Sequence, residues 1–226
     1  MAKIDELPPE AFLASLEEAN WTARAKCAER VAALYCQDKL DAVERGLAEE
    51  TFRLLCYDGE IVVRRLLAEC LKRAPDLPRD IALPIATDKS EIAVPFIEDS
   101  PSLADRDLLT ILRDHPGPHR LAIAGRRQVS EQVSDALCRC DDDMTAPMIL
   151  ANHGAAVSPG TLHWLLDQRP ERTILEAIAR RRLLPPAVGD RLRLVLMDRP
   201  GEATYATMPP VASPAAPSPQ LAAGAL

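Results

Sequence analysis

The chain has 226 residues and a formal net charge of −7, enough chain to bury the core of one large domain or two small ones. Only 4% of the residues are aromatic and nine are glycine, which argues against a β-sandwich, a β-barrel and a nucleotide site built on a glycine-rich loop. Alanine and leucine, two strong helix formers, dominate, so the composition predicts an all-α protein. The negative charge disfavours nucleic acid as a partner, because it repels the phosphate backbone.

The sequence predicts a cytoplasmic protein that has no contact with a membrane. The amino terminus carries Asp5 and Glu6 where a signal peptide has its apolar core. No stretch approaches the roughly 18 apolar residues that a membrane span needs. The six cysteines include no Cys-x-x-Cys pair, and we interpret them as small buried hydrophobic residues in a reducing compartment.

In chain order, the first predicted elements are three helices, over 9–19, 21–37 and 41–57. The first is short and acidic, and the other two carry apolar residues such as Val31 and Phe52 on one side. We expect residues 1–57 to form an amino-terminal helical cap on the remainder of the fold.

From residue 58 onward the sequence repeats with a period of about 26 residues, and the repeat is its most informative feature. An apolar residue, here named the pivot, recurs just before a polar or proline helix start, at steps of 26, 26, 28 and 27 residues. The pivots are Leu77, Leu103, Val129, Val157 and Leu184. The second helix of each unit opens with cap residues, among them Ser130 and Ser158.

Three more positions in each unit are apolar throughout, at seven and six residues before the pivot and eight after it. They are Cys70, Phe96, Ala122, Leu150 and Ala177; Leu71, Ile97, Ile123, Ala151 and Ile178; and Ile85, Ile111, Leu137, Leu165 and Leu192. A two-helix unit this short cannot bury its apolar face alone, whereas stacked units bury a continuous core. Residues 58–198 are therefore predicted to form a right-handed α-solenoid of about five short two-helix repeats.

The last unit ends in a strongly apolar helix that includes Leu194 and Leu196, and no polar capping repeat comes after it. Because an open solenoid end invites association, we expect this face to meet another subunit, a partner or the tail. Residues 199–226 are rich in proline and alanine without periodicity, and we predict that they are disordered.

The segment Glu91–Leu112 resembles the signature of an uncharacterised bacterial family with HEAT-like repeats, known as domain of unknown function 2336 and found mainly in alphaproteobacteria. The segments 24–34, 62–77 and 129–137 fit the same pattern, so the resemblance covers roughly residues 20–195. It implies HEAT-like repeats and carries over no catalytic residue.

Residues that could carry chemistry are few, and we predict no catalytic residue, no metal site and no cofactor. His115 and His119 stand four apart, but the intervening Pro-Gly-Pro indicates a turn instead of the helix that would align two metal ligands. Cys138 and Cys140, with His153 further on, lack the usual zinc spacing and are interpreted as structural.

Basic residues gather where the first helix of a unit ends. They are Lys72 and Arg73, Arg126 and Arg127, and Arg180, Arg181 and Arg182. Cations at these ends complement the helix dipole, and they are also able to hold an acidic or phosphorylated protein segment. Trp164 is either an aromatic anchor for a partner or a core residue. The candidate partner-binding residues are Arg126, Arg127, Trp164, Arg180, Arg181 and Arg182.

From these features we expect a non-enzymatic scaffold or regulator that binds another protein. Two alternatives stay open. One is a helical-repeat enzyme of glycosylase-like or lyase-like build, which the acidic charge and the scarcity of aromatic residues disfavour. The other is a sensor that binds a small ligand where the amino-terminal helices meet the first repeat.

Overall fold

The computed structural model describes residues 20–198, so the predicted helix 9–19 and the predicted disordered tail 199–226 lie outside the described residues. The described part of the chain forms twelve α-helices and no β-strand, which confirms the all-α prediction. The helices are α2 (Trp21–Cys36), α3 (Ala42–Leu55), α4 (Ile61–Leu71), α5 (Arg79–Ala86), α6 (Ser90–Asp99), α7 (Asp105–Asp114), α8 (Pro118–Gly125), α9 (Glu131–Cys138), α10 (Thr145–Ala151), α11 (Pro159–Gln168), α12 (Arg172–Ala179) and α13 (Pro186–Met197). None of these helices is both long and apolar enough to cross a membrane.

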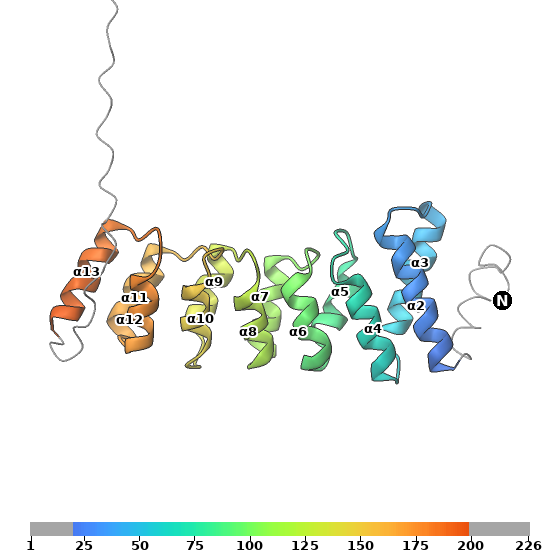
Figure 1. The fold of residues 1–226 in the computed structure, drawn as a ribbon, viewed down its shortest axis with the longest axis horizontal. Helices are drawn as coiled ribbons and strands as arrows, with labels where there is room; N and C mark the ends of the chain where they lie inside the picture. Colours follow the sequence, from blue (N-terminus) through green and yellow to red (C-terminus); the bar gives the residue numbers. More distant parts are fainter. Residues whose placement is uncertain (1–19, 199–226) are drawn as a thin grey trace, which may run out of the picture.

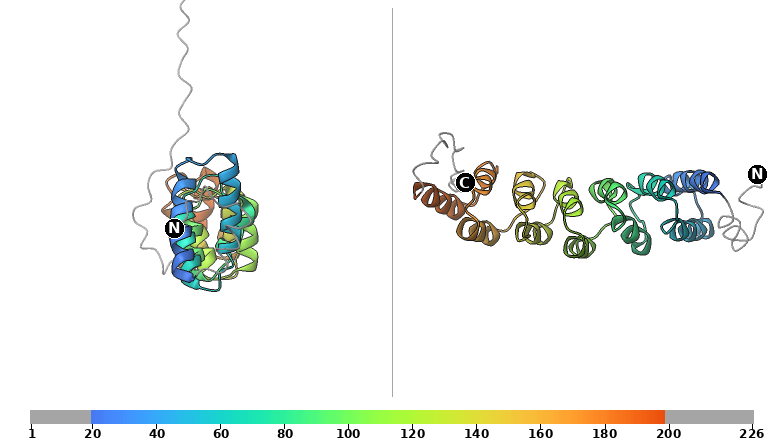
Figure 2. Two further views of the ribbon diagram at one scale, coloured as in Figure 1. Left: turned by 90° about the vertical axis from the view of Figure 1, so that its right-hand side faces the viewer. Right: turned by 90° about the horizontal axis from the view of Figure 1, so that it is seen from below.

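The helices stand in two rows, with the even-numbered helices in one row and the odd-numbered helices in the other (Figure 1, Figure 2). Linkers from an even helix to the next odd helix lie along one edge, the upper one in Figure 1. We call it the first edge, and its linkers are 37–41, 72–78, 100–104, 126–130, 152–158 and 180–185. The opposite, second edge holds linkers 56–60, 87–89, 115–117, 139–144 and 169–171.

The odd helices begin where the sequence predicts, because local side chains satisfy their first amides. The Ser130 side chain accepts a hydrogen bond from the Val133 amide, and Ser158 accepts one from Thr161. Pro186 occupies the first turn of α13, where a missing N–H costs nothing.

The odd helices from α5 onward bury a recurring set of positions, the third, fourth and seventh of each helix. These residues are Ile81, Ala82 and Ile85; Asp107, Leu108 and Ile111; Val133, Ser134 and Leu137; Thr161, Leu162 and Leu165; and Val188, Gly189 and Leu192. Positions three, four and seven lie on one face of a helix, so each odd helix turns one stripe toward the even row.

Two predicted core positions of the even row differ in the structure. Ala151 is exposed, and Ile149 and Leu150 are buried in its helix instead. The reason is the longer step of 28 residues to Val157, which moves the end of α10 relative to the pivot. Cys70 is half-buried beside the fully buried Leu71.

Candidate functional site

The structure separates the five candidate arginines into two groups, and the first group points inward to the backbone. Arg126 donates hydrogen bonds from its two terminal nitrogens to the carbonyls of Ile97 and Ser100, the latter at 2.8 Å. Arg181 does the same two units later, with the carbonyls of Leu150 at 3.0 Å and Ala155 at 2.8 Å. Both guanidiniums therefore bind the end of the preceding even helix.

Ser102 and Asn152 have the same role elsewhere on the first edge. The Ser102 hydroxyl donates to the carbonyl of Ala74 at 2.6 Å. The Asn152 amide donates to the carbonyls of Ala124 at 2.8 Å and Arg126 at 2.7 Å. Every linker from 100–104 to 180–185 thus supplies a side chain that caps the pair of helices before it.

The linkers 126–130 and 152–158 also pair through their backbones. The Val129 amide donates to the Gly154 carbonyl at 3.2 Å, and the Ala156 amide donates to the Val129 carbonyl at 3.1 Å. Gly154 is required here, since a Cβ on it would lie 1.9 Å from the Arg127 carbonyl oxygen.

The second group of arginines is exposed on the same edge. Arg127 and Arg182 form no hydrogen bond or ion pair with the described residues, and Arg180 forms an ion pair of 3.4 Å with Glu176. Each of these side chains is next to Arg126 or Arg181, whose backbone contacts fix the linker. Within residues 20–198, the first edge therefore presents two guanidiniums without a contact, those of Arg127 and Arg182, each beside an arginine that is bonded to the backbone.

Trp164 is half-buried on α11 and packs against the core. The Arg139 guanidinium lies 6.0 Å from the centre of its ring. Trp164 is thus mainly a packing residue that stays partly exposed.

The second edge is joined by arginine–aspartate pairs. Arg24 holds Asp58 through two bonds of 2.5 and 2.9 Å. Arg64 holds Asp88 through bonds of 2.7 and 3.2 Å and also donates to the Asp58 carbonyl at 2.6 Å. The two pairs form a continuous chain from α2 to the linker before α6.

Burial and hydrogen bonding act in opposite directions on these carboxylates. Burial alone raises the pKa of Asp58, but hydrogen bonds from Arg24 and the Glu60 amide outweigh it and lower that pKa. Burial likewise acts against the ionised form of Asp88, yet the hydrogen bonds from Arg64 and the Lys89 amide leave its pKa lowered.

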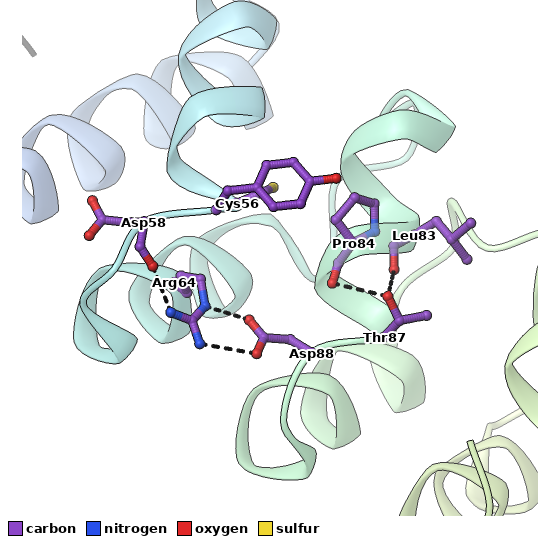
Figure 3. A pocket seen from close by; sticks show the side chains of 8 residues that line it. Cys56, Asp58, Arg64, Leu83, Pro84, Thr87 and Asp88 are labelled. Carbon is purple, nitrogen blue, oxygen red and sulfur yellow. Dashed lines mark hydrogen bonds and ion pairs between the residues drawn. The ribbon is translucent and has the colours of Figure 1, made fainter. Parts of the chain in front are cut away.

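A pocket of about 460 Å³ opens beside this chain of pairs (Figure 3). It is lined by Cys56, Tyr57, Asp58, Arg64, Leu83, Pro84, Thr87 and Asp88. Arg64 lies between Asp58 and Asp88, and the Thr87 hydroxyl donates to the Leu83 carbonyl at 2.9 Å. Burial raises the pKa of the Cys56 thiol to about 12, so it is not an activated nucleophile. The polar groups of the pocket are largely used in contacts with one another.

The histidines and remaining cysteines do not assemble a metal site in the described part of the chain, where no group of three suitable side chains occurs. His115 and His119 lie together, with ring centres 5.1 Å apart, and His119 Nε2 is 3.1 Å from the Asp88 carbonyl. Cys138 is buried, and burial raises its pKa to about 12.

The capping role of Arg126 and Arg181 escaped the sequence analysis, although a signal was present. Both residues stand three positions before a pivot, where the first two units have Ala74 and Ser100. Those two small residues are fully buried, so an arginine at the equivalent place has its stem inside the array.

Comparison with known proteins adds a family and nothing on activity. No curated protein and no solved structure matches the chain. The model of a family described as an uncharacterised protein conserved in bacteria (DUF2336) matches residues 92–212, more than half of the chain. The chain therefore belongs to this family.

Proposed function

We propose that the chain is a right-handed α-solenoid of HEAT-like repeats with an amino-terminal helical cap, and that it binds another protein without catalysing a reaction. The two rows of helices, the recurring buried positions and the capping bonds between successive pairs support the solenoid. Such an array presents long surfaces that suit a protein partner.

The observation that carries the binding proposal is the pair of exposed guanidiniums at Arg127 and Arg182. Neither has a partner among the described residues, and each follows an arginine fixed by two backbone carbonyls. An exposed guanidinium favours carboxylates and phosphates, so the partner segment is acidic or phosphorylated.

A peptide titration tests this proposal. We expect a glutamate-rich peptide and its phosphoserine counterpart to bind the wild type, and a glutamine counterpart not to bind. Arg127→Glu with Arg182→Glu should abolish binding. The matched control is Arg30→Glu with Arg65→Glu, which changes the net charge equally on exposed residues of α2 and α4. An equal loss of peptide binding in both double variants would mean that the net charge causes the effect, and not the positions of Arg127 and Arg182.

The last helix supports association through a second surface. Leu194 is 54% exposed and Met197 is 73% exposed, whereas Leu196 is half-buried against the core. The predicted contact of the last repeat with a subunit or partner is therefore better tested at Leu194 and Met197.

The pocket beside Arg64 favours a small-ligand sensor as a second candidate function. Its volume of about 460 Å³ lies within the range of ligand sites. Thr87→Trp would fill it, and a ligand that raises the melting temperature of the wild type but not of this variant would support the sensor.

A further inference from the structure

A group of uncharged side chains occupies the middle of the even row. It consists of Leu121 and Gly125 on α8, Met148 and Ala151 on α10, and Met144 directly before α10. We call it the methionine patch. Met144 is 66% exposed and Met148 is 39% exposed. A Cβ on Gly125 would lie 3.3 Å from the Met148 Cε atom, so the two helices share one continuous apolar surface.

Opposite charges flank the methionine patch. On α6, Glu91 and Glu98 are exposed and form no ion pair with the described residues. A Cβ on Gly125 would lie 3.8 Å from Glu98 Oε1, so this carboxylate borders the patch directly. At the end of α12, Arg180 is exposed and forms an ion pair of 3.4 Å with Glu176.

We propose that the methionine patch binds a second copy of this chain in an antiparallel arrangement. The twofold axis runs parallel to the helices, between α8 and α10 and between the two facing copies. It places the α6 of one copy opposite the α12 of the other. Glu98 then faces the partner copy's Arg180, and the apolar patches meet in the middle. Such an interface is self-complementary, as a twofold dimer requires.

The size of the surface indicates a weak dimer. Four helices about 10 Å apart and about 15 Å long present on the order of 600 Å². A stable interface buries about 800 Å² on each partner, so we expect association at micromolar concentration or above. Flexible methionines suit such a contact, because they adapt to the opposing surface.

Sedimentation over a range of concentrations tests the proposal. We expect the wild-type mass to rise toward that of a dimer. Met148→Glu, Glu98→Arg and Arg180→Glu should each weaken association at least about tenfold, since every substitution acts twice in a twofold dimer. The double variant Glu98→Arg with Arg180→Glu should restore the dimer, because it exchanges the charges.

The matched control is Val43→Glu, which charges an exposed apolar position on α3, in the odd row, instead. We expect it to leave the dimer unchanged, and circular dichroism to show that all variants are folded. A monomeric wild type at every concentration would overturn the proposal. So would a dimer that Met148→Glu leaves intact and Leu194→Glu on α13 disrupts, or a double variant that stays monomeric. The peptide binding at Arg127 and Arg182 is measured separately and does not depend on this outcome.

Discussion

The two edges of the array join neighbouring helix pairs by different main contacts, although Arg73 pairs with Asp99 on the first edge and Arg169 donates to two carbonyls on the second. On the first edge, side chains of one linker donate to backbone carbonyls of the pair before it; these side chains are Ser102, Arg126, Asn152 and Arg181. On the second edge, arginines bind aspartates of neighbouring linkers; examples are Arg24–Asp58, Arg64–Asp88 and Arg120–Asp142.

This difference decides which edge of the array responds to pH. Backbone carbonyls and guanidiniums do not titrate at accessible pH, so the first edge keeps its bonds in acid. Aspartates do titrate, and the second edge loses its pairs once they are protonated. We therefore predict that the stability of the first edge depends on the geometry of its hydrogen bonds, and that the stability of the second edge depends on the charge of its aspartates.

The largest effect is expected for Arg126→Ala. This change leaves the Ile97 and Ser100 carbonyls without their donor and removes a half-buried stem, so the free energy of unfolding should fall by about 3 kcal/mol. Urea unfolding measures it. Arg127→Ala is the matched control, with an expected change below about 0.5 kcal/mol. Equal losses in the two variants would contradict the capping role.

Gly154→Ala should break the first edge through its backbone. The added methyl group would meet the Arg127 carbonyl oxygen at 1.9 Å, and the pairing with Val129 would have to shift. We expect a loss of about 2 kcal/mol in thermal or urea unfolding. Gly125→Ala is the control, because its methyl group would meet only the flexible side chains of Met148 and Glu98, and helix propensity favours alanine.

The second edge should lose stability in acid, because its ion pairs need ionised aspartates. The pKa values of Asp58 and Asp88 are lowered in the folded chain, so their stabilisation is present above the unfolded pKa of about 4 and is lost as the pH falls through the folded values. Asp88→Asn should cost about 1–2 kcal/mol at pH 7.

Unfolding measured between pH 7 and pH 2 checks the sign of this effect. The difference between wild type and Asp88→Asn should shrink below pH 4, since the wild type loses the same charge there. A difference that stays constant over this range would show that Asp88 stabilises the edge by packing alone.

Much of the fold could be predicted because it rests on local patterns. Cap residues such as Ser130 and Ser158 and the period of about 26 residues placed the helices near their observed bounds. The bonds between linkers could not be predicted in the same way. Arg126 reaches a carbonyl 29 residues earlier, and only its place three residues before the pivot distinguishes it from its exposed neighbour Arg127.

The smallest effect is expected for Arg191→Ala, which separates burial from geometry. Arg191 and Asp167 are 24 residues apart, as are Arg64 and Asp88, and their closest distance is 2.7 Å in both pairs. Side-chain exposure differs: 45% for both members of the first pair, against 16% and 13% for the second. Because water and salt screen exposed pairs, and because Arg64 also donates to the Asp58 carbonyl, Arg191→Ala should cost below about 0.5 kcal/mol and Arg64→Ala clearly more. Equal costs in urea unfolding would mean that burial does not decide the strength of these pairs.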